Sequence, residues 1–210
     1  MSNMLKQNNK NKEIKITMLR DMENFYLQKL SEYTLKSIPK LLESVRVYNK
    51  VLTLNTTPNN LKAVLLYLQN HSLFMCKQLQ EITCIDRPDK KLRFNVVYTL
   101  YSVKYNTQVL VTVQLPIDSQ LPSAIQIFEG ANWLEREVLD LFGIFFVGHP
   151  DQRRILTDYG FQGYPLRKDF PLSGFIEIYY NDSNKRIVYE PVELSQETRI
   201  WWVSTRSATK

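Results

Sequence analysis

Three carboxylates, Glu135, Glu137 and Asp140, lie close together in one amphipathic stretch and could form a pair for general acid–base chemistry. The same spacing also suits a simpler purpose. Glu135 stands three residues after Asn132, which is the spacing of a capping box, and acidic side chains are favoured in the first turn of a helix. The pattern therefore favours helix capping and a solvated face over catalysis.

A second group of reactive side chains follows this stretch. His149 could act as a general base, although a histidine that flanks a helix and directly precedes a proline favours a structural role. The pairs Arg153–Arg154 and Arg167–Lys168 could bind phosphate groups. The segment carries nearly as many acidic as basic residues, however, and Arg mixed with Tyr and Phe is typical of a protein–protein interface core.

Few residues are suited to metal or redox chemistry. Cys76 and Cys84 are too few for an iron–sulfur cluster, which takes about four cysteine ligands, and they do not form a CxxC pair. His71 and His149 lie far apart, so a histidine metal site is not expected. The longest uncharged apolar run, residues 141–147, is far shorter than the ~20 residues of a spanning helix.

The chain is basic, with a formal net charge of +6 and a pI of about 9.2. This charge permits an RNA-binding protein, for example a mitochondrial ribosomal protein. Lysine and asparagine richness is also the residue usage of an AT-rich genome, which we favour as the explanation. The strand expected at residues 94–101 lacks the glycine of an RNA-recognition motif, which argues against RNA binding.

Hydrophobic periodicity predicts the elements that must position these residues. Thr57 and Pro58 mark a helix start, with Thr57 as N-cap, and Gly143 suits the left-handed position that ends a helix. A polar turn is expected at Asn49–Lys50. The periodicity predicts helices over residues 21–38, 58–71 and 132–142, and strands over 45–48, 51–54, 74–85, 94–101 and 109–115.

The predicted fold class is α+β, with one sheet packed with helices on one face, followed by a long irregular extended C-terminal segment. All six glycines lie between residues 130 and 174, in a part of the chain that stays rich in aromatic residues. Such a segment must fold back or lie on a partner. We predict a mobile N-terminal extension over residues 1–20, an α+β domain over 21–142 and a C-terminal interaction segment over 143–210.

The run NWLEREVLDLFGIFFVGHPDQRRILTDYGFQGYPLRKDFPLSG, residues 132–174, closely resembles the motif region of the thirty-kilodalton subunit of respiratory complex I. That family includes subunit 9 of the mitochondrial NADH–ubiquinone oxidoreductase and the C subunit of the bacterial enzyme. The likeness extends over roughly residues 24–203. Departures from the mitochondrial pattern are modest and include Gln152, Gln162, Tyr164 and Leu139.

The resemblance implies a non-catalytic core subunit of the peripheral arm, on the matrix side of the mitochondrial inner membrane. Such a subunit braces the forty-nine-kilodalton subunit and the quinone-reducing region while electrons pass from NADH to ubiquinone and protons are translocated. It implies that the assembled complex uses NADH, FMN, iron–sulfur clusters and ubiquinone, and that this chain binds none of them. The expected partners are the forty-nine-kilodalton complex I subunit and its neighbours in an obligate hetero-oligomer, without nucleic acid and without a membrane span.

The resemblance assigns no catalytic, cofactor-binding or metal-binding residue to this chain. The enzyme activity, H+-translocating NADH:ubiquinone reductase, would belong to the complex. The alternatives are an RNA-binding protein, a free-standing hydrolase that uses the carboxylates of the 135–140 helix, and a related subunit of a chloroplast or hydrogenase-type complex. The residues expected to orient the segment or to contact partners are Glu135, Arg136, Glu137, Asp140, Gly143, His149, Pro150, Arg153, Arg154, Tyr159, Phe161, Arg167, Lys168, Asp169 and Phe170.

Overall fold

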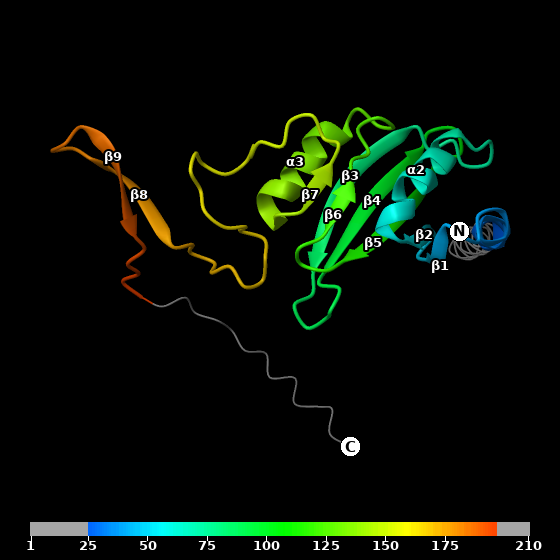
Figure 1. Ribbon diagram of the computed structural model, residues 1–210, viewed down its shortest axis with the longest axis horizontal. Coiled ribbons are helices and arrows are strands. Elements are labelled where there is room, and N and C mark those ends of the chain that lie inside the picture. The colour runs from blue at the N-terminus through cyan, green and yellow to red at the C-terminus, as the bar shows by residue number, and fades with distance from the viewer. Residues whose placement is uncertain (1–24, 197–210) are drawn as a thin grey trace, which may run out of the picture. The chain divides into compact units, whose positions relative to one another are not determined.

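The computed structural model describes residues 25–196 (Figure 1). The chain divides into two compact units, and the first of these ends at Lys168. The predicted mobile extension, residues 1–20, lies outside the described part, and so do residues 197–210. The two units are described separately below.

The first unit is built on a five-stranded mixed sheet with the strand order β1-β2-β5-β4-β3. Strands β2 and β5 run parallel, and every other neighbouring pair is antiparallel. Alternating Val, Ile, Leu and Thr residues account for these strands, because such side chains fit a half-buried pleated surface. The strands are β1 (Leu42–Tyr48), β2 (Val51–Thr56), β3 (Gln78–Asp86), β4 (Phe94–Ser102) and β5 (Thr107–Leu115).

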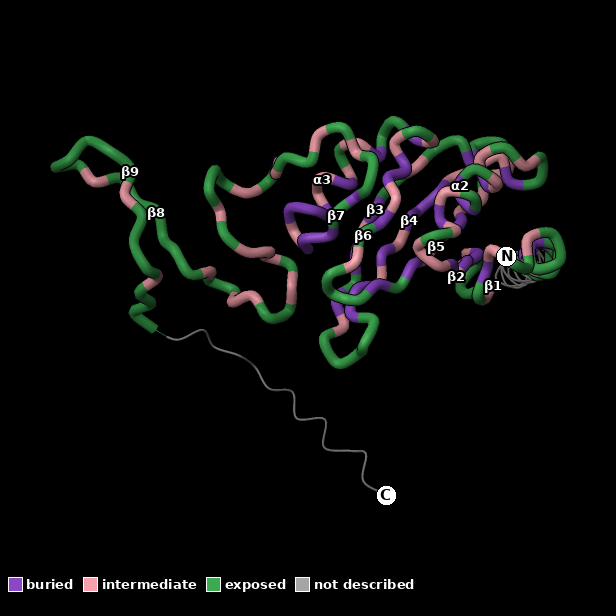
Figure 2. The backbone as a smooth tube through the Cα atoms, viewed as in Figure 1, coloured by how far each residue is buried: buried purple, intermediate pink, exposed green. Residues whose placement is uncertain are grey.

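Helices cover one face of this sheet (Figure 1). Residues 25–37 are helical, the short 3-10 helix η1 (Pro58–Asn60) leads into α2 (Leu61–Asn70), and α3 (Ala131–Phe142) follows later. Every second side chain of the central strands is buried against them in one hydrophobic core. Figure 2 shows the buried residues along these strands and α2. The predicted α+β class is confirmed.

Local turn chemistry explains where the elements begin and end. Asn49 and Lys50 both have positive φ, 48° and 63°, as a two-residue hairpin turn requires, and the predicted turn is confirmed. Thr57 does occupy the N-cap position before Pro58, but its side chain makes no capping hydrogen bond. The strand predicted from Phe74 begins only at Gln78, because the amides of Phe74 and Met75 both donate to the carbonyl of His71 in a turn.

Helix α3 connects two short strands, β6 (Gln120–Pro122) and β7 (Phe145–Val147), which pair with each other in parallel. The helix begins at Ala131, directly after Gly130. Asn132 therefore lies inside the helix, and the prediction that it is the N-cap of a capping box is wrong. Gly143 adopts the left-handed conformation at the C-terminal end with φ of 75°, as predicted.

The second unit contains an antiparallel hairpin of β8 (Ile176–Asn181) and β9 (Arg186–Pro191). From the sequence we predicted an irregular segment here. The compact first unit also runs on to Lys168, beyond residue 142 where we placed the end of the α+β domain. Among the described helices, none has the length and apolar character of a membrane span.

Candidate functional site

Residues 143–168 follow α3 and return across the first unit almost without regular structure; we call them the strap. Irregular backbone must find hydrogen-bond acceptors outside helices and strands. In the strap these acceptors are side-chain carboxylates and main-chain carbonyls of the α+β body. The predicted orienting residues Asp140, Gly143, Arg154 and Arg167 meet at these contacts.

Asp140 is the principal anchor of the strap. Its carboxylate is buried and accepts hydrogen bonds from three successive backbone amides, those of Ile155 (3.2 Å), Leu156 (2.7 Å) and Thr157 (2.9 Å). The Thr157 hydroxyl donates to the other carboxylate oxygen at 2.7 Å. An anion that accepts several amide hydrogen bonds holds the donating loop in one conformation.

Electrostatics keeps Asp140 ionised in spite of its burial. Desolvation by burial acts to raise the pKa of this carboxyl, but the hydrogen bonds from Thr157, Leu156 and Ile155 outweigh it, so the pKa lies below its ordinary value. The anchor is therefore a carboxylate at neutral pH. A catalytic acid would need the opposite shift.

Arg154 joins this anchor to a later part of the strap. Its guanidinium donates to Asp140 at 3.1 Å and to the carbonyl of Gly163 at 3.0 Å. It also lies over the rings of Phe161 and Tyr164, with centroid distances of 5.9 and 5.1 Å. One arginine thus links α3 to both halves of the strap.

A second contact lies at the end of α3. Arg167 donates to the carbonyl of Phe142 at 2.6 Å and stacks on Tyr164 at 4.3 Å. A Cβ atom on Gly143 would lie 2.5 Å from the Tyr164 ring and 2.6 Å from the Arg167 guanidinium. Only glycine provides both this space and the positive φ at that position.

A buried ion pair fixes the last residue of the strap. Asp86, at the end of β3, binds Arg93 through two hydrogen bonds of 2.6 and 2.8 Å, and both side chains are almost fully buried. Asp86 also accepts the backbone amide of Lys168 at 2.8 Å. The hydrogen bonds from Arg93 lower the pKa of Asp86, although burial opposes the shift. We predicted neither Asp86 nor Arg93 from the sequence.

Glu135 is buried and holds the segment after β6 in place. Its two carboxylate oxygens accept the Ser123 hydroxyl at 2.7 Å and the Ala124 amide at 2.6 Å. The predicted capping and solvated-face role is therefore wrong for Glu135, because these donors lie before the helix in sequence but beside it in space. Burial raises the pKa of Glu135, and the two hydrogen bonds and nearby His149 act in the opposite direction.

His149 has a structural position with a defined tautomer. Its side chain is fully buried, and Nδ1 accepts the backbone amide of Asp151 at 3.0 Å. Nε2 therefore carries the proton and donates to the carbonyl of Asn132 at 3.2 Å, with Glu135 4.0 Å away. Both ring nitrogens are engaged within the chain.

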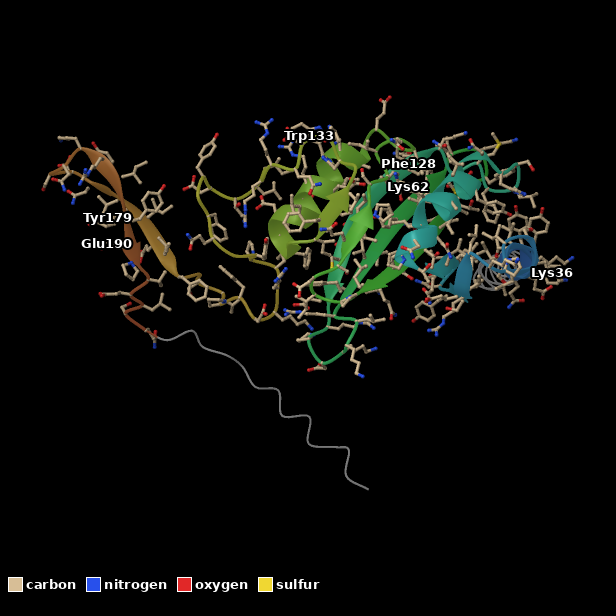
Figure 3. All side chains as sticks on the ribbon, viewed as in Figure 1. Lys36, Lys62, Phe128, Trp133, Tyr179 and Glu190 are labelled. Carbon is tan, nitrogen blue, oxygen red and sulfur yellow. The ribbon has the colours of Figure 1, made fainter. Side chains whose placement is uncertain are left out.

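Other predicted residues lie on the surface. Trp133 is exposed (Figure 3), and Arg136 stacks on its ring at 5.1 Å and donates to the carbonyl of Arg153 at 3.1 Å. Arg153 pairs with Asp151 at 2.8 Å, and its side chain is 77% exposed. Tyr159 is almost completely exposed. These side chains are therefore available to a partner.

The remaining predicted residues lie at other positions in the two units. Glu137 is half-buried on α3, Pro150 is exposed, and Lys168 contributes its backbone amide. Asp169 and Phe170 belong to the second unit. There Phe170 packs edge-on against Phe175, with ring centroids 5.3 Å apart.

The side chains in the described part of the chain do not fit an iron–sulfur cluster or a bound metal ion. Cys76 and Cys84 are buried, and burial raises the pKa of each thiol to about 12, whereas cluster ligands are thiolates. Among residues 25–196, no three His, Cys, Asp or Glu side chains form a group that could hold a metal ion. The anchors described above orient the chain's own backbone.

Comparisons with known proteins place this arrangement in a family. The sequence model described as "Respiratory-chain NADH dehydrogenase, 30 Kd subunit" matches residues 54–176. The NADH-ubiquinone oxidoreductase subunit 9 of Reclinomonas americana is 44% identical over 183 residues, which are 87% of this chain and 89% of that protein. The C subunit of the NADH-quinone oxidoreductase of Rhizobium johnstonii is 47% identical over 173 residues, 82% of this chain and 86% of its own length.

Two relatives from Candida maltosa and Candida albicans carry names that include "mitochondrial", and each is 44% identical over 179 residues. The chain spans 65% and 64% of their lengths. A chain in the structure of the archaeal membrane-bound sulfane sulfur reductase shares the fold, with a TM-score of 0.60 and 24% identity over 69% of this chain and 85% of that one. The chain belongs to the family of the thirty-kilodalton subunit of the respiratory-chain NADH dehydrogenase.

Proposed function

We propose that this chain is a non-catalytic core subunit of the peripheral arm of respiratory complex I in mitochondria, on the matrix side of the inner membrane. It braces the forty-nine-kilodalton subunit and the quinone-reducing region while the complex transfers electrons from NADH to ubiquinone and translocates protons. Family membership and the mitochondrial relatives support this proposal. The comparisons do not support the RNA-binding alternative.

The observation that carries the proposal is the exposed apolar surface of the second unit. Leu172 is 89% exposed and Phe175 is 64% exposed, and large apolar side chains of both hairpin strands are also exposed. A two-stranded hairpin is only marginally stable by itself in water. Contiguous apolar surface of this kind marks an interaction site, so the second unit is suited to contact other subunits.

The strap precedes the second unit in the chain and is itself fixed to the α+β body by hydrogen bonds. Asp140 holds residues 155–157, and Asp86 holds Lys168, the last residue of the first unit. Electron transfer and quinone chemistry require cofactors and pockets at fixed separations. A rigid connection between subunits maintains such separations, and this is the role we assign to residues 143–210.

The cofactors of the proposed activity, NADH, FMN, iron–sulfur clusters and ubiquinone, belong in this proposal to other subunits. The two buried thiols of this chain are too few and too weakly acidic to serve as cluster ligands. The chain's own contribution is binding and positioning. It acts as an obligate member of a hetero-oligomer.

A truncation after Lys168 tests the proposal. In cells that assemble the complex, the full chain should migrate on a native gel of mitochondrial membranes in a very large band with NADH-oxidising activity. The truncated chain should leave that band and should reduce its amount. A protease-resistant first unit in the truncated protein would show that it still folds. A fully active, normally abundant complex containing the truncated chain would contradict the proposal.

A further inference from the structure

The strand register gives the hairpin one face without a polar side chain other than tyrosine hydroxyls. Residues opposite each other in an antiparallel pair point to the same face, and successive residues alternate. Apart from the proline, the side chains of this face are 47–60% exposed. We call it the apolar face; it consists of Ile176, Ile178, Tyr180, Ile187, Tyr189 and Pro191.

The reverse face of the hairpin has a different chemistry. Glu177, Glu190 and Arg186 lie on it, and the Tyr179 hydroxyl donates to Glu190 at 2.8 Å (Figure 3). This hydrogen bond raises the pKa of Tyr179, so its phenol stays protonated. The reverse face carries the charged groups of the two strands and is suited to water.

An apolar groove continues from the apolar face. It has a volume of about 640 Å³ and is lined almost entirely by apolar residues, including Phe170, Leu172, Phe175 and Leu194. Pro191 belongs to both the groove and the apolar face. The two features therefore form one continuous apolar surface within the second unit.

We propose that this apolar face and its groove are the docking surface of the second unit, and that their occupant is an uncharged, apolar surface of a neighbouring subunit. The reverse face stays in water. The inference rests on the proposed function and deepens it, because it assigns the contact to one side of the hairpin. Figure 2 shows how exposed both strands are without that occupant.

The absence of charge on the apolar face and the size of its exposed area indicate which occupant fits it. The face has no ionised side chain, so a charged partner surface would lose its hydration without gaining an ion pair. Half-exposed side chains of this size contribute on the order of 100 Å² each, so the six provide roughly 600 Å², and the groove residues add to this toward the roughly 800 Å² that one partner brings to a stable interface. A partner surface of about that size is therefore required.

Two adjacent tyrosines provide a matched test. Tyr180 lies on the apolar face and Tyr179 on the reverse face. We would introduce Tyr180→Cys or Tyr179→Cys and measure the rate of maleimide labelling in the assembled complex, in the isolated full chain and after denaturation. In the folded chain the native Cys76 and Cys84 give little background, because both are buried and their thiol pKa values are about 12. In the denatured chain both become reactive, so peptide mass spectrometry must separate their labelling from that of the introduced cysteine.

The expected result is protection at one position only. In the complex, Y180C should react roughly tenfold more slowly than in the denatured chain, since a packed interface excludes solvent, while Y179C reacts at nearly its denatured rate. In the isolated chain both should react fast. Equal labelling of the two cysteines in the complex would overturn the inference, as would protection of Y180C already in the isolated chain, which would indicate that residues 197–210 or a second copy cover the face.

Photo-cross-linking identifies the occupant. A benzophenone attached to Y180C should give one product with another subunit, whereas a product of twice the chain's mass would indicate a second copy and overturn the inference.

An independent test compares two double variants by the amount of assembled complex on a native gel. I178T with I187T, on the apolar face, should lower this amount, and Y179T with V188T, on the reverse face, should not. If truncation after Lys168 lowers assembly but both pairs assemble normally, the proposed function stands and this inference fails.

Discussion

The strap and the second unit are both rich in Pro and aromatic residues, yet they are stabilised in opposite ways. In the strap, backbone amides are held by the buried carboxylates of Asp140 and Asp86, and Tyr164 lies beneath an arginine. In the second unit, Leu172 and Phe175 are mainly exposed. The strap finds its partners in its own chain, whereas the second unit leaves apolar surface for other chains.

This difference shows that composition does not reveal where a segment finds its contacts. A single buried acceptor can hold several residues of loop, as Asp140 does for residues 155–157. Because such an anchor is polar, it holds a loop without burying the loop's apolar side chains. The aromatic residues of the loop can then make other contacts. Substitutions can therefore test whether contacts within the chain hold the strap in place, and whether the second unit lacks such contacts.

The largest expected effect on the strap comes from Asp140→Ala. The change removes the buried acceptor of three backbone amides and leaves Arg154 without its carboxylate, which should lower the free energy of unfolding by about 3–5 kcal/mol. Urea unfolding of the full chain measures this loss. Asp118→Asn, on an exposed turn, is the control and should leave the unfolding midpoint unchanged. Similar midpoints for both variants would contradict the anchor role.

Alanine substitutions at two glycines distinguish the cost of steric crowding from the cost of backbone strain. Gly143 and Gly160 both have φ of 75°, but a Cβ on Gly160 would have no neighbour within 4 Å. Gly160→Ala should cost only the left-handed backbone strain, about 1–2 kcal/mol. Gly143→Ala should cost a further ~1–3 kcal/mol, because its Cβ displaces Tyr164 and Arg167. Equal losses in thermal unfolding would show that this close approach is unimportant.

The carboxylate anchors also predict an acid-sensitive strap. The pKa values of Asp140 and Asp86 are lowered in the folded chain, so their stabilisation is present above the unfolded value of about 3.9 and is lost as the pH falls through the folded values. Glu135 has a raised pKa, so its contribution is instead lost as the pH rises through that value.

Protease cleavage within the strap should therefore increase below about pH 4. Proteases active at each pH, with rates normalised to cleavage of the denatured chain and fragments identified by mass spectrometry, measure the site and rate of cleavage. Asp140→Asn should already be cleaved faster at neutral pH and should respond less to acid, because it has one ionising anchor fewer. Cleavage of the wild-type strap at the same rate from pH 3 to pH 7 would disprove the prediction.

Much of the fold follows from local sequence, whereas the anchors do not. Alternating strands, the Asn49–Lys50 turn and the left-handed Gly143 depend on neighbouring residues, and the sequence indicated all of them. Glu135 was interpreted as a capping residue because its real donors, Ser123 and Ala124, lie in another element. Local spacing cannot show such a partner.

Two further features left some signal in the sequence. The alternation of Ile176, Ile178 and Tyr180 before a polar turn indicates a strand, although the glycine-rich context suggested irregular structure. Asp86 and Arg93 flank the connection between β3 and β4, which contains Pro88, and opposite charges at the two ends of a hairpin can pair. The contact of Asp86 with the amide of Lys168, 82 residues later, is visible only in the folded chain.

Among these substitutions, Arg153→Ala should change the free energy of unfolding least. It therefore best separates an effect on the stability of the chain from an effect on assembly of the complex. Arg153 is mostly exposed and pairs with exposed Asp151, so urea unfolding of the variant should match that of the wild type. If Arg153 meets a partner in the complex, the variant should nevertheless lower the amount of assembled complex on a native gel, because a charge pair desolvated at an interface loses one member. Normal assembly with slow turnover would instead show that the subunit affects the chemistry, and a purely architectural role would be wrong.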